Sequence, residues 1–129
     1  KTLALLATLG QKGRSIVNVL GVTFKENCSD VRNSQVFSLI KYLQDHGIEV
    51  NVADPLADPV VVQNEQGVGL VPMEHLSPAD ALVIAVPHQL FDGEDLVSKL
   101  TYSAGIFVDV KSAYRDVIAD RPDLTYWSL

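Results

Sequence analysis

Three short and almost uninterrupted apolar runs constrain the fold of this chain more than any other feature. They cover Ile16–Leu20, residues 81–86 and residues 105–110, and glycine, proline or polar residues bound them. A strand that is apolar on both sides belongs to a parallel sheet with both faces covered. Segments with a helical pattern alternate with these runs, as in sheets built from strand–helix–strand units. We therefore expect one α/β domain, a three-layer Rossmann-like fold with a mostly parallel sheet.

The other expected elements follow from periodicity and from breakers. An apolar stripe over residues 35–46, with Ser34 as N-cap, predicts a helix that ends at Gly47. Glu49–Ala53 is predicted as the second strand. The remaining expected elements are the end of a helix in 1–9, a short helix over 58–66 with Asp58 as cap and Pro59 at its first position, a short strand over 68–71, a helix over 92–100 and a last strand over 124–127.

Composition excludes several classes of protein. The 129 residues are 47% hydrophobic and 20% charged, which suits one globular domain. The net charge of −6 disfavours a nucleic-acid or anionic-membrane surface, and no apolar run is long enough to cross a bilayer. The single cysteine, Cys28, excludes an internal disulfide framework and a cysteine-rich metal site, so no metal is expected.

The ends of the sequence suggest a piece of a longer protein. The chain begins at Lys1 without a methionine and shows no recognisable secretory signal. We expect residues 1–14 to be the end of a preceding linker or central helix and residues 15–129 to be the domain. A cytoplasmic location is also expected.

The polar loop over residues 21–33, between the first strand and the following helix, is the strongest candidate site. Open parallel sheets bind ligands just beyond the carboxyl ends of their strands, and a helix N-terminus there favours an anion. Lys25 and Lys111 are expected to converge on one anionic group, and Phe24 to offer its ring to a base or sugar. The full candidate set is Thr23, Phe24, Lys25, Asn27, Arg32, Asp54, His88, Asp109 and Lys111.

Other chemistries fit these residues less well. The loop has a single glycine, Gly21, instead of Gly-x-Gly-x-x-Gly, so this domain is not expected to bind NAD. Cys28 has no histidine near it in sequence that would activate it, and His88 suits a structural hydrogen bond better than catalysis. Both roles stay open, whereas Asp30 and Arg32 are expected to brace the loop.

Two alternatives from other classes remain. A small stand-alone enzyme would have to use Cys28 or His88. A flavodoxin-like or receiver-like module would act in regulation or interaction instead of catalysis. A receiver, however, needs an acidic cluster at the end of its first strand, where this chain carries Lys25.

Residues 21–34 resemble a known signature. They read GVTFKENCSDVRNS and are similar to Gly-x-x-Phe-Lys-x-[Asn/Asp]-[Thr/Cys]-x-Asp-x-Arg-x-Ser, found in the C-terminal UDP-binding domain of the UDP-glucose/GDP-mannose dehydrogenase family. Residues 47–55, 81–91 and 107–111 resemble that family as well, so the similarity extends from about Ile16 onward. The pattern looks most like the branch that oxidises UDP-N-acetylhexosamines for surface polysaccharides.

The resemblance implies a function for the chain. Such enzymes oxidise the C6 alcohol of a UDP-sugar to a carboxylate, in two steps with two NAD⁺, for polysaccharide biosynthesis. Phe24, Lys25 and Lys111 would contact the UDP portion, with Lys111 where the UDP-glucose branch has arginine. NAD and the catalytic cysteine would belong to upstream NAD-binding and central helical domains of a homo-oligomeric enzyme. The chain itself would hold no cofactor and no catalytic residue, and would be inactive alone.

Overall fold

A five-stranded sheet in which every described strand pair is parallel forms the centre of the molecule. The computed structural model describes residues 15–23, 36–86, 101–110, 114–118, 122 and 124–128. The strand order is β2-β1-β3-β4-β5. The strands are β1 (Ile16–Leu20), β2 (Glu49–Ala53), β3 (Ala79–Ile84), β4 (Thr101–Asp109) and β5 (Thr125–Ser128). The predicted parallel α/β fold is therefore confirmed.

Both faces of the sheet are covered by apolar side chains, as the uninterrupted apolar strands predicted. Val19 and Val83 belong to one buried cluster, while their chain neighbours Leu20 and Leu82 belong to another. Successive side chains of a strand point to opposite faces, so the two clusters are the two sides of the sheet. The first side is the larger one, and α2 (Val36–Asp45) packs there.

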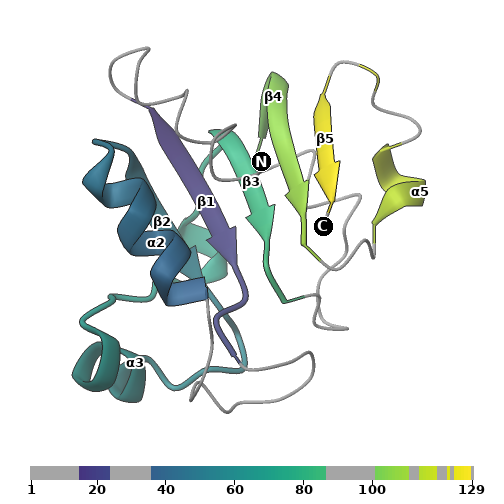
Figure 1. Cartoon of the computed structure of the whole chain (residues 1–129). Coiled ribbons are helices and arrows are strands. Elements are labelled where there is room, and N and C mark those ends of the chain that lie inside the picture. The colour runs from purple at the N-terminus through teal and green to yellow at the C-terminus, as the bar shows by residue number, and fades with distance from the viewer. Residues whose placement is uncertain are drawn as a thin grey trace.

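Helix α3 (Pro59–Gln66) begins and ends at its local capping signals, whereas Ser34, the predicted N-cap of α2, lies outside the described residues. Helix α2 lies across the β1–β2 side of the sheet (Figure 1) and buries a stripe made of Val36, Phe37, Ile40 and Leu43. Helix α3 starts at Asp58, whose Oδ1 accepts a hydrogen bond from Val60 N at 2.9 Å. It ends at Gly67, which is left-handed at φ 68°. The predicted cap and helix are both confirmed.

Several predicted strand limits are wrong by a few residues. Strand β3 covers Ala79–Ile84 instead of 81–86, and β5 covers Thr125–Ser128 instead of 124–127. Strand β4 begins at Thr101, four residues before the predicted start. Ala85 and Val86 are buried although they follow the strand, because the sheet's apolar packing extends into the next loop. An apolar run marks buried residues, so it can extend beyond the last residue of a strand.

Other elements depart further from the prediction. The expected strand over 68–71 is only a single bridge between Leu70 and Val52. Two short elements were not predicted, the 3₁₀ turn η1 (Met73–His75) and α5 (Arg115–Ile118). The helices expected over 1–9 and 92–100 lie outside the described residues. Among the helices that are described, none is both long and apolar enough to cross a membrane.

The strand order places a switch point between β1 and β3. The chain passes from β1 to β2 on one side, then returns to the other side of β1 for β3, β4 and β5. The arrows of β1, β3, β4 and β5 run toward one common edge in Figure 1. In open parallel sheets, ligands bind beyond the carboxyl ends of the strands at such a switch point. This edge is therefore the place to look for a site.

Candidate functional site

The loops at the carboxyl ends of the strands are joined to one another by backbone hydrogen bonds. Gly21 N donates to the carbonyl oxygen of Ala53 at 3.0 Å, and Ala85 N donates to that of Leu20 at 2.9 Å. Val110 N donates to the carbonyl oxygen of Ile84 at 3.2 Å. The first residues after β1, β3 and β4 thus extend the hydrogen bonding of the sheet beyond the strands. These hydrogen bonds connect the carboxyl ends of all strands from β2 to β4.

Gly21 stands at the switch point because no side chain fits there. Its φ is 90°, in the region that favours glycine. A Cβ built on Gly21 would lie 2.7 Å from both Cβ and the carbonyl oxygen of Val86, and 2.8 Å from its amide nitrogen. The loop after β1 therefore passes directly against the loop after β3, and this close approach requires glycine.

Asp54, one of the candidate ligand contacts, is held by backbone amides. Its Oδ2 accepts a hydrogen bond from Val22 N at 2.8 Å, while Oδ1 accepts from Leu56 N at 2.8 Å and Ala57 N at 3.2 Å. Only 6% of its surface is exposed. Several N–H donors on one buried carboxylate satisfy its charge, so Asp54 braces the loops after β1 and β2.

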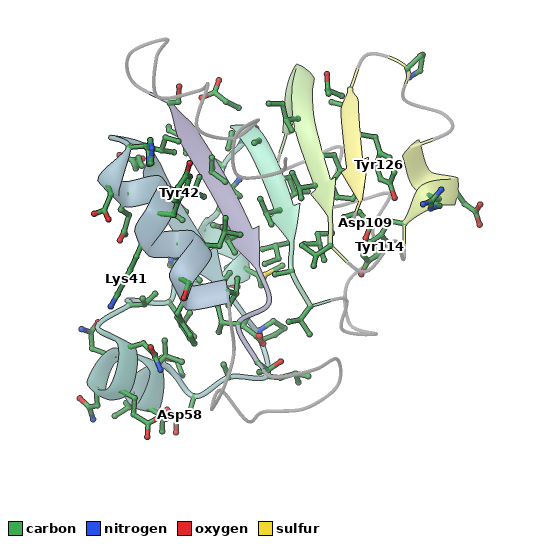
Figure 2. The ribbon with its side chains drawn as sticks, viewed as in Figure 1. Lys41, Tyr42, Asp58, Asp109, Tyr114 and Tyr126 are labelled. Atoms are coloured by element: carbon green, nitrogen blue, oxygen red, sulfur yellow. The ribbon has the colours of Figure 1, made fainter. Side chains whose placement is uncertain are left out.

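Asp109, a second candidate, is the last residue of β4. It is completely buried, and its Oδ2 accepts hydrogen bonds from Tyr114 N at 2.7 Å and from the Tyr126 hydroxyl at 2.8 Å. Figure 2 shows the three residues together at this end of the sheet. Burial raises the pKa of the Tyr114 hydroxyl from its usual 10.0 to about 12, and the negative charge of Asp109 adds to the effect.

The two tyrosines that hydrogen-bond Asp109 both pack against a third aromatic ring. Phe107, fully buried, packs its ring against Tyr114 at a centroid distance of 6.3 Å and edge-on against Tyr126 at 5.7 Å. The sequence prediction missed the part played by Tyr114 and Tyr126. The two adjacent aromatic residues of β5, Tyr126 and Trp127, were the available signal, but only the register of β5 with β4 shows that Tyr126 faces Asp109.

The structure describes only part of the predicted site. Thr23, Asp54 and Asp109 lie at the carboxyl edge as expected, and all three are buried. Among the described residues, no group of three or more histidine, cysteine, aspartate or glutamate side chains is arranged to hold a metal ion. The other candidates lie outside the described residues and stay predictions, namely Phe24, Lys25, Asn27, Cys28, Asp30, Arg32, His88 and Lys111.

Residues 18–116 match the family model for the UDP-binding domain of the UDP-glucose/GDP-mannose dehydrogenase family. The chain belongs to this family. The matched span runs from the middle of β1 through the switch point to the start of α5, so it contains Gly21, Asp54 and Asp109 but not β5.

Related proteins agree with the family assignment. Protein CapL from Staphylococcus aureus is 38% identical over 97 residues, which are 74% of this chain and 23% of CapL. A UDP-N-acetyl-D-glucosamine 6-dehydrogenase from Salmonella typhi is 40% identical over 77 residues, or 60% of this chain and 18% of that enzyme. The chain therefore spans about a quarter or less of the length of these relatives.

The solved structures agree on the fold. UDP-N-acetyl-mannosamine dehydrogenase Cap5O from S. aureus superposes with a TM-score of 0.65 at 19% identity, over 98% of this chain and 29% of that structure. The strand order by itself does not separate this family from flavodoxin-like proteins, because a 2-1-3-4-5 order also occurs there. The family match decides against the regulatory-module alternative.

Proposed function

We propose that this chain binds the UDP portion of a UDP-sugar as the C-terminal domain of an NAD-dependent UDP-sugar 6-dehydrogenase. The match of residues 18–116 to the UDP-binding domain carries the proposal. The switch point between β1 and β3 supports it, since such crevices bind nucleotides in open parallel sheets.

Three residues are proposed to contact UDP. Lys25 and Lys111 would neutralise the diphosphate, and Phe24 would lie against the uracil or ribose. Strands β1 and β4 are separated only by β3, so the segments that lead to the two lysines start roughly 10 Å apart. The proposal places the diphosphate between these segments, where it would be contacted by one lysine from each. Asp30 and Arg32 are proposed to brace the first of the two loops.

The bracing carboxylates support this assignment. Asp54 holds Val22, two residues before Phe24 in sequence. Asp109 holds Tyr114, three residues after Lys111. Both loops therefore leave the sheet from anchored positions, as a preorganised binding site requires.

The oxidation itself is proposed to need more than this chain. Gly21 is the sole glycine of residues 21–34, and a dinucleotide pyrophosphate needs several glycines for close backbone approach. NAD and the catalytic cysteine are accordingly assigned to the NAD-binding and central helical domains of the full-length protein, which we propose to be a homo-oligomer. Alone, the chain would bind UDP but would not oxidise the sugar.

The relatives suggest a finer substrate assignment. Enzymes named UDP-N-acetyl-D-glucosamine 6-dehydrogenase from S. typhi and Pseudomonas aeruginosa are 40% and 32% identical to the chain over the aligned residues. We propose a UDP-N-acetylhexosamine as the substrate, polysaccharide biosynthesis as the purpose and the cytoplasm as the location.

Calorimetric titration of the chain with UDP tests the proposal. Replacing Lys25 or Lys111 by alanine should each weaken UDP binding by about tenfold, the typical loss for a charge-assisted hydrogen bond. Lys41, exposed on α2, provides the charge-matched control, and Lys41→Ala should leave the affinity unchanged. NAD⁺ titrated alone should produce no heat of binding. Equal effects of all three substitutions, or no binding of UDP, would contradict the proposal.

A further inference from the structure

The Asp109 carboxylate connects three elements at the edge of the sheet. It ends β4, accepts a hydrogen bond from the backbone of Tyr114 just before α5, and accepts another from the Tyr126 hydroxyl of β5. The carboxylate is fully buried, so these hydrogen bonds are what make its charge tolerable there. Its position is consequently determined by groups on both neighbouring elements.

The described residues that flank Lys111 in sequence, Val110 and Tyr114, are both held by hydrogen bonds. The hydrogen bond from Tyr114 N to Asp109 Oδ2 spans residues 110–113. At the start of this segment, Val110 N donates to the carbonyl oxygen of Ile84 in β3 at 3.2 Å. In the sequence, Lys111 comes two residues after Asp109 and three before Tyr114.

Tyr126 reaches Asp109 because of the register between β4 and β5. Tyr126 pairs with Phe107, and Asp109 pairs with Ser128. Tyr126 is therefore the diagonal neighbour of Asp109 on the same face of the sheet. Its ring already packs edge-on against Phe107, so the ring is held independently of the hydroxyl. Removing the hydroxyl would delete one hydrogen bond to Asp109 and leave the packing in place.

We propose that Asp109 and Tyr126 are positioning residues of the UDP site, which act on UDP by holding the segment that carries Lys111. This inference rests on the proposed function, because it assigns Lys111 to the diphosphate. Tyr126 itself needs no contact with UDP. Strand β5 would then contribute to binding through the hydrogen bond from Tyr126 to Asp109, although β5 does not border the switch point between β1 and β3.

A double-mutant cycle in the 129-residue chain tests the inference. UDP affinity is measured by calorimetry for the wild type, Tyr126→Phe, Lys111→Ala and the double variant. We expect Tyr126→Phe alone to weaken binding about three- to tenfold, the scale of one hydrogen bond to a charged group acting through a neighbour. In the Lys111→Ala background the same substitution should change the affinity by less than about twofold, since the contact that it positions is gone.

Matched controls separate positioning from general stability. Tyr42→Phe removes a hydroxyl from a partly buried tyrosine on α2, whose ring centroid lies 4.2 Å from that of His46, and should not change UDP affinity in either background. Asp109→Asn is a second variant that keeps the size of the side chain and should show the same dependence on Lys111. Thermal melts of each variant verify that the chain is folded at the temperature of titration.

The outcomes distinguish the two proposals. Equal weakening by Tyr126→Phe with and without Lys111 would mean a purely structural role and would overturn the inference, as would unchanged affinity in Tyr126→Phe. If the wild type binds UDP but Lys111→Ala does not weaken it, the inference is likewise wrong while UDP binding stands. Absence of UDP binding by the folded wild type would overturn the proposed function and the inference with it.

Discussion

Asp54 Oδ2 accepts a hydrogen bond from the backbone amide of Val22 at 2.8 Å, which ties the end of β2 to the loop that follows β1. The two residues are 32 positions apart in the chain. The other carboxylate oxygen, Oδ1, accepts hydrogen bonds from the backbone amides of Leu56 and Ala57. One buried side chain therefore holds the loops after β1 and β2. The stability of this edge of the sheet therefore depends on Asp54.

Asp54→Ala should lower the free energy of unfolding by about 2–4 kcal/mol, because buried N–H donors lose their acceptor. Urea denaturation followed by circular dichroism measures this loss. Asp58→Ala is the matched control, since the Asp58 carboxylate accepts one exposed amide at the start of α3 and its loss should cost about 1 kcal/mol. Equal losses in the two variants would show that Asp54 is only a local cap.

Gly21→Ala should be far more damaging than Gly47→Ala. Both glycines have positive φ, 90° and 77°. A Cβ at Gly47 meets nothing within 4 Å, so only the backbone conformation opposes alanine there, at about 1–2 kcal/mol. A Cβ at Gly21 would meet backbone and Cβ atoms of Val86 at 2.7–2.8 Å, which adds a steric cost of several kcal/mol.

Urea denaturation of both glycine variants checks the difference. Gly21→Ala should unfold with reduced cooperativity or show no folded baseline. Gly47→Ala should keep a cooperative unfolding transition, with its midpoint at a lower urea concentration than in the wild type. If Gly21→Ala were as stable as Gly47→Ala, the loops after β1 and β3 could not be in the close contact described here.

The raised pKa of Tyr114 predicts a loss of stability at high pH. In the folded state the Tyr114 hydroxyl stays protonated up to about pH 12, whereas in the unfolded state it loses its proton near pH 10. Between these values the unfolded state binds fewer protons, so the free energy of unfolding falls as pH rises, by up to about 1.4 kcal/mol per pH unit. The contribution of Tyr114 is fully present below pH 10.

Tyr114→Phe should remove this part of the pH dependence. The difference in unfolding free energy between wild type and Tyr114→Phe, measured by urea denaturation at several values above pH 9, isolates it from other titrating groups. Ultraviolet difference absorbance of tyrosinate gives a second measurement. If the unfolding free energies of the two proteins changed in parallel with pH, the pKa of Tyr114 would not be raised in the folded chain.

Phe107→Ala should be among the most destabilising substitutions in the buried cluster that contains Leu20 and Leu82. The side chain is fully buried and packs against both Tyr114 and Tyr126, so its removal should cost about 3–5 kcal/mol. Val60→Ala, at a position 65% exposed on α3, should change the stability by less than about 0.5 kcal/mol. Thermal or urea unfolding of both variants provides the comparison.

Local sequence patterns account for much of this fold. The apolar runs predicted strands buried on both sides, and the alternation of Val19 and Leu20 between the two clusters agrees with that. Asp58 and Pro59 directly precede the residues of α3, so the start of this helix was predicted from short-range chemistry alone. The signature over residues 21–34 pointed to the family that the match over 18–116 establishes.

The partners of the buried carboxylates were decided by the tertiary structure. The sequence placed Asp54 and Asp109 after strands and suggested ligand contacts, but not that Asp54 would hold Val22 or that Asp109 would hold Tyr126. The carboxyl end of β3 was also misplaced, because Ala85 and Val86 stay buried after the strand ends. Caps and apolar periods depend on neighbours within a few residues, and sequence shows them. Register and hydrogen bonds between distant strands depend on which segments the fold brings side by side, and only the folded chain determines that.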